Sequence, residues 1–144
     1  MRVTEEEFAA LQQPQHPQPA PIKRRAPQPT EAQEQAALIA WAHLRKFTIP
    51  ELRLLFHIPN GGKRNIREAV KLKRMGTLRG IPDLFLSIAR GGFHGLWIEM
   101  KTPKGQLSKE QRHMLRDLEA EGYRVVVCRT WLEAQTIILD YLKL

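Results

Sequence analysis

Two acidic residues and a lysine occupy positions in this 144-residue chain that suit metal-dependent chemistry. Asp83 stands at the start of an apolar segment, and Glu99 and Lys101 stand at the end of the next one. Residues two apart on a β-strand project to the same face, so Glu99 and Lys101 are expected to point together. If the two segments pair as a hairpin, Asp83 lies opposite the end of the second strand. All three side chains then meet at one edge of a sheet.

This grouping predicts hydrolysis of a phosphodiester with the help of a divalent cation. A hard cation such as Mg²⁺ prefers carboxylate and carbonyl oxygens, and the Met100 carbonyl can add a ligand to the two acids. The metal would polarise the phosphodiester and lower the pKa of a bound water. Lys101 would orient that water and stabilise the charge that develops on the phosphoryl oxygens.

The same residues also allow a purely structural explanation. An aspartate after a proline is common in turns, and an acid two residues before a lysine is often a surface ion pair. Two features favour catalysis. Glu99 follows the apolar residues 95–98, where an unpaired carboxylate would be costly. The triplet also lies in the basic part of the chain.

The positive charge of the chain is concentrated in one region. The formal net charge is +8, and residues 53–101 hold ten basic and three acidic side chains. Such a surplus indicates a polyanionic partner, because each phosphate contact releases condensed counterions, although a solubilising surface has the same composition. The residues expected to bind DNA are Lys63, Arg64, Arg67, Lys71, Arg74 and Lys104.

Three of these residues follow helical spacing. Arg67, Lys71 and Arg74 fall at i, i+4 and i+7, along one face of a helix. Lys63 and Arg64 precede that helix, near an N-terminus whose N–H groups favour a phosphate. The apolar residues expected on its buried side are Ile66, Ala69 and Val70. No base-reading helix is visible, so recognition of the DNA backbone and shape is predicted.

The elements that position these residues alternate between helical and strand patterns. Helical patterns that begin at a capping residue cover 30–47, 65–76, 108–122 and the segment from 130. Strand patterns cover 53–58, 83–88, 94–101 and 123–129, and the last is apolar on both faces, as in a buried central strand. This order predicts an α/β fold, with a mixed β-sheet flanked by α-helices.

The N-terminal part of the chain differs from the rest. Residues 12–29 hold six of the ten prolines, so 1–29 is expected to be a disordered Pro/Gln-rich arm before a folded domain at 30–144. No apolar stretch approaches the roughly 20 residues of a membrane span, and no secretory signal is visible. A single cysteine, Cys128, fits a reducing compartment. These features favour a cytoplasmic protein.

Other reactive or aromatic side chains are expected to be structural. His57 ends a strand near a loop and could reach DNA, but a lone histidine in an apolar run usually packs. Cys128 lies in a strand expected to be buried and inert. Trp41, Trp97 and Trp131 stand at positions compatible with a core. They are not interpreted as base-stacking residues.

Four motifs resemble the VRR-NUC family in order and spacing. They are HIPNGG at 57–62, GIPDL at 80–84, IEMK at 98–101 and LSKEQ at 107–111. The resemblance covers residues 30–144, and the family is a branch of the PD-(D/E)XK nucleases. It implies a restriction-endonuclease-like core and Mg²⁺- or Mn²⁺-dependent phosphodiester hydrolysis. Asp83 and Glu99 would be metal ligands, with Lys101 as the catalytic lysine.

The resemblance also implies roles for residues on two helices. In the first helix, an E-x-x-x-Q pattern implies that Glu31, followed by Gln35, helps to bind the metal, with Glu34 as a substitute. Gln111 matches a glutamine on the helix after the catalytic lysine. The residues themselves allow simpler explanations: Glu31 complements a helix dipole, and Gln111 forms a capping box with Ser108.

The resulting expectation is a Mg²⁺-dependent endodeoxyribonuclease. Stand-alone VRR-NUC members resemble Holliday-junction resolvases, which implies branched DNA as a candidate substrate and a homodimer as the assembly. A non-catalytic DNA-binding or recombination accessory module with the same fold is the alternative, and an RNA-directed nuclease is a third. The presence of Asp83, Glu99 and Lys101 argues against the accessory module.

Overall fold

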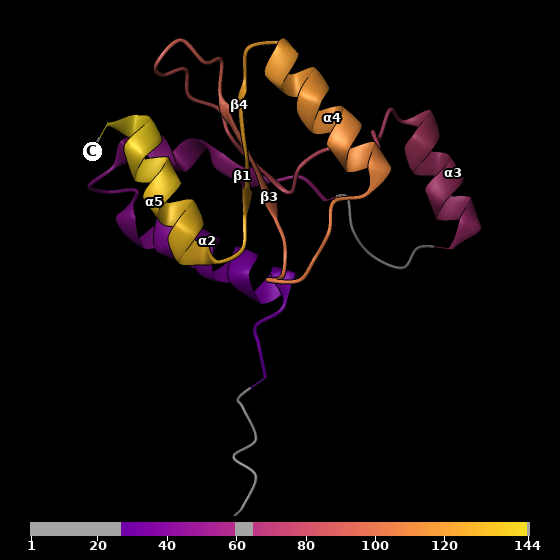
Figure 1. Ribbon diagram of the computed structural model, residues 1–144, viewed down its shortest axis with the longest axis horizontal. Coiled ribbons are helices and arrows are strands. Elements are labelled where there is room, and N and C mark those ends of the chain that lie inside the picture. The colour runs from indigo at the N-terminus through magenta and orange to yellow at the C-terminus, as the bar shows by residue number, and fades with distance from the viewer. Residues whose placement is uncertain (1–26, 60–64, 144) are drawn as a thin grey trace, which may run out of the picture.

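A four-stranded mixed sheet forms the centre of the computed structural model, which describes residues 27–59 and 65–143 (Figure 1). Its strands, in spatial order, are β1 (Leu55–His57), β2 (Leu84–Leu86), β3 (Leu96–Met100) and β4 (Arg124–Cys128). Strand β2 is antiparallel to both β1 and β3, and β4 runs parallel to β3. The predicted α/β architecture is confirmed. The predicted arm lies outside the described residues except for 27–29.

The helices begin where the capping residues predict. They are α2 (Glu31–Arg45), α3 (Ile66–Arg74), α4 (Lys109–Ala120) and α5 (Trp131–Leu142), with a 3₁₀ helix, η1 (Pro50–Leu54), after α2. The side chain of each predicted N-cap accepts a hydrogen bond from the N–H three residues later, and the caps are Thr30, Asn65, Ser108 and Thr130. None of the helices in residues 27–59 and 65–143 has the length and apolar character needed to span a bilayer.

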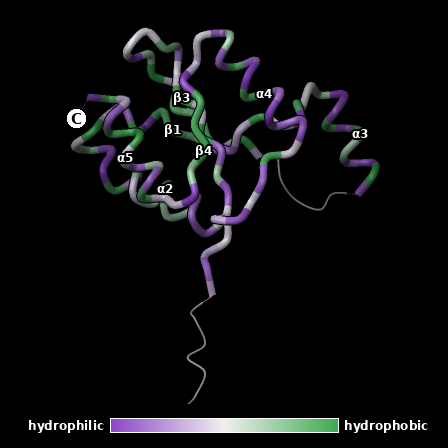
Figure 2. The backbone as a smooth tube through the Cα atoms, in the orientation of Figure 1, coloured by the Kyte–Doolittle hydropathy of each residue, from purple (hydrophilic) through white to green (hydrophobic). Residues whose placement is uncertain are grey.

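The two faces of the sheet are covered by different helices. In Figure 1, α2 and α5 lie side by side on one face and α4 lies on the other. Alternate residues of β3 divide between these faces, so Leu96, Ile98 and Met100 join the core beneath α2 and α5. Trp97 and Glu99 point the other way, toward the α4 side. Figure 2 shows hydrophobic strands at the centre and surrounding helices in which hydrophobic and hydrophilic residues are mixed.

The β2–β3 hairpin brings the two candidate carboxylates to the same end of the sheet. A bridge between Arg90 and Phe93 closes its turn. The antiparallel register pairs Leu84 with Ile98. Extending that register by one residue sets Asp83 opposite Glu99, as the hairpin hypothesis predicts.

Two strand predictions are wrong in detail. The strand expected at 53–58 is limited to β1, because Pro50 begins a 3₁₀ helix that continues to Leu54. The strand expected to be central, β4, lies at the edge of the described sheet, and most of its residues are only half-buried. Its apolar character has another cause, since α5 contacts one side of β4 and α4 the other.

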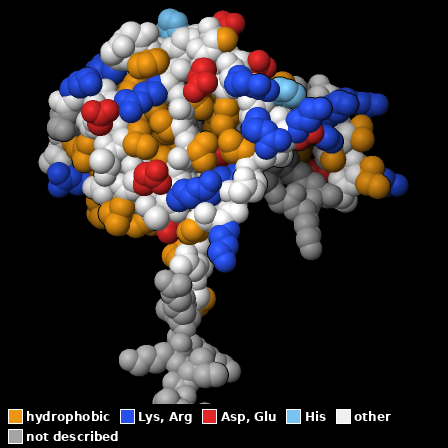
Figure 3. Space-filling view, in the orientation of Figure 1, with side chains coloured by type: hydrophobic (Ala, Val, Ile, Leu, Met, Phe, Trp, Pro, Cys, Tyr) orange, Lys and Arg blue, Asp and Glu red, His pale blue; other side chains and the backbone are white. Residues whose placement is uncertain are grey.

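The environment of α3 also differs from the prediction. None of its residues is buried: Ile66 is 84% exposed and Val70 is 48% exposed, and Ala69 is exposed as well. Helix α3 stands beyond α4 and makes no extensive contact with another described element (Figure 1). Figure 3 shows Lys and Arg side chains gathered where α4 and α3 approach each other.

Candidate active site

Asp83 is held by backbone contacts on both sides. Its carbonyl oxygen accepts hydrogen bonds from Ile58 N–H at 2.8 Å and from His57 Nδ1 at 2.9 Å. Since a carbonyl only accepts, Nδ1 must carry a proton. The Asp83 carboxylate accepts from Met100 N–H through Oδ2 at 2.9 Å, and burial raises its pKa. The aspartate is therefore fixed against the end of β3.

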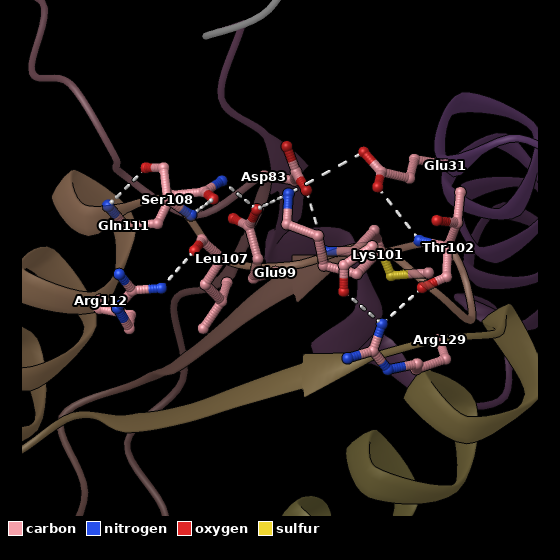
Figure 4. Close-up of polar contacts among 12 residues, drawn as sticks. Glu31, Asp83, Glu99, Lys101, Thr102, Leu107, Ser108, Gln111, Arg112 and Arg129 are labelled. Carbon is pink, nitrogen blue, oxygen red and sulfur yellow. Dashed lines mark hydrogen bonds and ion pairs between the residues drawn. The ribbon is translucent and has the colours of Figure 1, made fainter.

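Glu99 is a buried carboxylate with one satisfied oxygen. The residue is 1% exposed, and its Oε1 lies 2.8 Å from Lys101 Nζ and accepts from the Gln111 amide (Figure 4). Its Oε2 is buried and has no hydrogen-bond partner among the described residues. Burial raises the pKa of Glu99 to about 7, although the hydrogen bond from Lys101 opposes the shift. An unsatisfied buried carboxylate oxygen is costly unless another group binds it.

Lys101 extends into the site from the end of β3. Its N–H donates to Cys128 O of β4 at 2.9 Å, which continues the ladder past Met100. Its side chain is 11% exposed and bonds Glu99 as described. Burial tends to lower the pKa of Lys101, but the pairing with Glu99 and the nearby charges of Glu31 and Asp83 raise it overall. The ammonium therefore stays charged at neutral pH.

The first turn of α2 supplies a third carboxylate. Glu31 Oε1 accepts from Thr102 N–H at 3.1 Å, and Oε2 lies 3.9 Å from Lys101 Nζ (Figure 4). Glu34 is turned elsewhere, because its Oε2 accepts from Trp131 N–H at 2.7 Å. The structure therefore places Glu31, and not Glu34, beside the lysine.

Gln111 combines the two functions considered for it. Its Oε1 accepts from Ser108 N–H at 2.9 Å, which completes a capping box, while its Nε2 donates to Glu99. The two ends of one amide group thus cap α4 and orient the carboxylate. Gly80 permits this arrangement: with φ of +77°, it lies so close to α4 that a Cβ would be 2.7 Å from the Glu110 carbonyl.

A pocket of about 510 Å³ opens onto these groups. Its lining residues are Glu31, Arg79, Gly80, Ile81, Asp83, Glu99, Lys101, Ser108, Glu110 and Gln111. Arg79 and Glu110 had no assigned role in the sequence analysis. The pocket brings together carboxylates from α2, the start of β2 and the end of β3, as a site for a cation and a phosphate requires.

The donor groups fit a hard cation that retains waters. No three His, Cys, Asp or Glu side chains within 27–59 and 65–143 form a ready metal-binding cluster. The Lys101 N–H faces β4, so the adjacent Met100 turns its N–H and C=O the other way, toward Asp83. Asp83, Glu99 and the Met100 carbonyl then offer three oxygens. Mg²⁺ commonly uses one or two carboxylates and keeps several waters.

Four of the residues expected to bind DNA are described, and none of the four lines this pocket. Arg67, Lys71 and Arg74 are exposed on α3, and Lys104 is exposed after β3. Lys63 and Arg64 lie outside the described residues. These four basic side chains therefore lie on the surface.

Several other side chains differ from or extend the sequence predictions. His57 is exposed and bonds Asp83, so the expectation that it packs is wrong. Cys128 is buried as expected, and burial raises the pKa of its thiol to about 12. Arg129 holds the chain after Lys101 through the carbonyls of Thr102 and Gly105. No sequence signal indicated this arginine, because its partners are distant along the chain.

The tryptophans contribute to packing as predicted. Trp97 is 9% exposed and stacks on Phe85 with ring centroids 4.2 Å apart. Trp41 and Trp131 are partly buried and pack against the core.

Comparisons with known proteins agree with this fold and site. A model of the VRR-NUC domain family matches residues 18–131. A solved structure described as a "VRR_NUC domain protein" is 34% identical and superposes with a TM-score of 0.71, over 82% of this chain and 92% of that chain. No curated protein matches the sequence. The comparison confirms the α/β, restriction-endonuclease-like fold.

Proposed function

Because the chain belongs to the VRR-NUC family of the PD-(D/E)XK superfamily, whose members are generally nucleases, we propose that it is a Mg²⁺-dependent endodeoxyribonuclease. Mn²⁺ is expected to substitute for Mg²⁺. The site that we assign to this reaction is the pocket around Asp83, Glu99 and Lys101.

One observation carries the proposal. The carboxylate of Glu99 is buried, yet only one of its oxygens is bonded, and the other has no partner within the described residues. A protein core seldom tolerates such an oxygen without a ligand. Asp83 lines the same pocket as Glu99, and its Oδ2 accepts from Met100 N–H, so a divalent cation is the ligand that best explains the unpaired oxygen.

Each residue of the site has a role in the proposed reaction. A divalent cation supplies Lewis-acid activation of the phosphodiester and of the attacking water. Asp83, Glu99 and the Met100 carbonyl would hold it, with Glu31 as a further ligand of the cation or of its waters. Lys101, kept charged by Glu99, would orient the nucleophile and stabilise charge on the phosphoryl oxygens.

Gln111 acts on the reaction through Glu99. Its amide donates to the oxygen of Glu99 that also bonds Lys101, so the second oxygen of that carboxylate would remain free to bind the cation. Ligand carboxylates are often oriented by such hydrogen bonds, and their loss weakens metal binding.

We propose that DNA approaches the pocket past the exposed basic residues of α3 and of the chain after β3. The exposed residues Arg67, Lys71, Arg74 and Lys104, together with Lys63 and Arg64, would contact phosphates. Branched DNA, including four-way junctions, is the candidate substrate, and a homodimer would bring two sites to two strands. These two points depend on the family resemblance.

The test is cleavage by the purified protein. Plasmid, forked and four-way DNA substrates are incubated with Mg²⁺, and parallel reactions contain EDTA. At least one substrate should be cut with Mg²⁺ and none with EDTA. Asp83→Asn and Lys101→Ala should each abolish cutting, whereas Arg90→Ala, at the opposite end of the hairpin, should retain it.

Other results would contradict the proposal in different ways. Binding of DNA without cleavage by the wild-type protein would favour the accessory module. Cleavage of a matched RNA duplex in preference to DNA would favour an RNA-directed nuclease. Cutting that survives both Asp83→Asn and Lys101→Ala would exclude the proposed site.

A further inference from the structure

Arg129, directly after β4, holds the turn that follows Lys101. Its guanidinium Nη1 donates to the carbonyl oxygens of Thr102 and Gly105, the latter at 2.8 Å (Figure 4). The backbone N–H of Arg129 donates to Glu133 Oε2, in the first turn of α5, at 2.6 Å. The arginine is thus fixed at its base by α5, and its tip is bonded to residues 102–105, which we call the 102–105 turn.

The 102–105 turn also holds Glu31. Thr102 N–H donates to Glu31 Oε1 at 3.1 Å, and the other oxygen of that carboxylate lies 3.9 Å from Lys101 Nζ. Gly105 N–H closes the turn on the Thr102 carbonyl at 3.0 Å. A Cβ on Gly105 would lie 3.2 Å from Glu31 Oε1, so the turn is packed closely around the carboxylate.

The choice of an arginine at this position is informative. No carboxylate of the described residues is found within ion-pair distance of the Arg129 guanidinium. It bridges two carbonyl oxygens from one nitrogen, Nη1, whose two N–H donors are fixed in the guanidinium plane, whereas the donors of a lysine ammonium rotate. Arg129 is also absent from the lining of the pocket, so it acts on the site through other residues.

We propose that Arg129 is a positioning residue, which sets the place of Glu31 beside Lys101 by holding the 102–105 turn. Without the two bonds from Arg129, the Thr102 N–H is no longer fixed. The Glu31 carboxylate then loses its hydrogen bond and its orientation toward the lysine. The catalytic part of this inference rests on the proposed nuclease function, but the geometric part does not.

A double-mutant cycle tests the catalytic part. Arg129→Ala should lower kcat about 10- to 100-fold, as losses of orienting contacts do, with a much smaller change in the KM for DNA. In a Glu31→Gln background, Arg129→Ala should lower kcat by less than about threefold, because Arg129 acts on the reaction through Glu31. Equal losses in both backgrounds would overturn the proposal.

Two matched variants control for charge and for general damage to β4. Arg124→Ala removes the arginine at the other end of the strand, which pairs with Asp140 at 3.0 Å, and should leave kcat unchanged. Arg129→Lys keeps the charge, but its ammonium rotates freely on a shorter stem and should hold the two carbonyls less firmly, so it should recover only part of the lost kcat. A loss in Arg124→Ala equal to that in Arg129→Ala, or full recovery in Arg129→Lys, would contradict the positioning role.

Amide hydrogen exchange tests the geometry without any nuclease assay. In Arg129→Ala, exchange at Thr102 should accelerate at least about tenfold, while Lys101 N–H, bonded to Cys128 O at 2.9 Å, should stay protected. If Arg129→Ala fails to fold, Arg129→Lys should show a smaller acceleration at the same amide. Unchanged exchange at Thr102 would overturn the positioning role. If exchange at Thr102 changes as expected but the wild-type protein cleaves no DNA, only the nuclease proposal would be rejected.

Discussion

The ammonium nitrogen of Lys101 lies 2.8 Å from Oε1 of Glu99, within a site where the glutamate is 1% exposed. This contact satisfies one oxygen and leaves Oε2 buried without a partner among the described residues. The lysine also fails to offset the burial fully, since the pKa of Glu99 is raised to about 7. The charged carboxylate is therefore costly to the folded protein in the absence of a cation.

The stability of the metal-free protein should depend on the charge of Glu99. A raised pKa means that the folded state binds this proton more tightly than the unfolded chain, so stability is lost as the pH rises from 4.5 through about 7. Glu99→Gln cannot titrate and should remove this part of the pH dependence, on the order of 2 kcal/mol. Urea unfolding in EDTA at about pH 5 and about pH 8 measures it. If the free energies of unfolding of the wild type and of Glu99→Gln change equally between these pH values, the account of Glu99 is contradicted.

Gly80→Ala should disturb both stability and activity. A Cβ at this position would lie 2.7 Å from the Glu110 carbonyl and 2.8 Å from Gln111 N, so α4 must shift. We expect a loss of about 2–3 kcal/mol in the free energy of unfolding, with reduced cleavage because Gln111 moves away from Glu99. Thermal melts and cleavage rates measure the two effects.

Gly76→Ala is the matched control for this substitution. Gly76 has a similar φ of +89°, but a Cβ there would meet no described atom within 4 Å, so only backbone strain of about 1 kcal/mol is expected. Cleavage by Gly76→Ala should be normal. Equal effects of the two substitutions would show that the close contact of Gly80 with α4 is unimportant.

Gln111 and Ser108 separate helix capping from the orientation of Glu99. Gln111→Ala removes both its cap contact and its bond to the carboxylate, whereas Ser108→Ala removes only the hydroxyl that caps α4. Each should cost about 1 kcal/mol of stability. Only Gln111→Ala should also lower kcat, by about tenfold or more. Similar kcat values for the two variants would exclude an orienting role for Gln111.

The exposed basic residues of α3 should contribute to DNA affinity and not to the chemical step. Replacing Arg67, Lys71 and Arg74 by alanine should weaken the salt dependence of DNA binding. The slope of the logarithm of the DNA association constant against the logarithm of the salt concentration should become shallower by about 0.9 for each lost phosphate contact. The kcat at saturating DNA should change little, because α3 supplies no residue to the pocket. Fluorescence anisotropy across a salt series measures the slope.

Arg90→Ala provides the comparison for the α3 variants. It removes an exposed arginine that pairs with Glu51 at 3.1 Å, near the hairpin turn and away from α3. Its salt slope should match that of the wild type. An unchanged slope in the α3 variants would show that the helix does not lie along the DNA.

The arrangement of the catalytic strands follows from local sequence patterns. Strand alternation is a property of neighbouring residues, so Glu99 and Lys101 can be assigned to one face without knowledge of the fold. A glycine-rich turn between two apolar segments then predicts the hairpin that brings Asp83 to them. For the same reason the helix caps, which involve residues three apart, are predicted correctly.

The features that depend on distant contacts could not be predicted in this way. Arg129 and Thr102 are 27 residues apart, and nothing in either segment indicates that they bond. Glu31 and Glu34 both suit the first turn of a helix, and only the packing of α2 against α5 turns Glu34 toward Trp131. The apolar residues of α3 follow a buried pattern, but no other described element packs extensively against them.

The most direct test of the account is a crystal structure with Mn²⁺, located by its anomalous scattering. The account predicts an anomalous peak bonded to Asp83, to Oε2 of Glu99 and to the Met100 carbonyl, with Lys101 Nζ beside it. Asp83→Asn should weaken or abolish the peak. A peak elsewhere, or no peak between the two carboxylates at saturating Mn²⁺, would contradict the metal-dependent site.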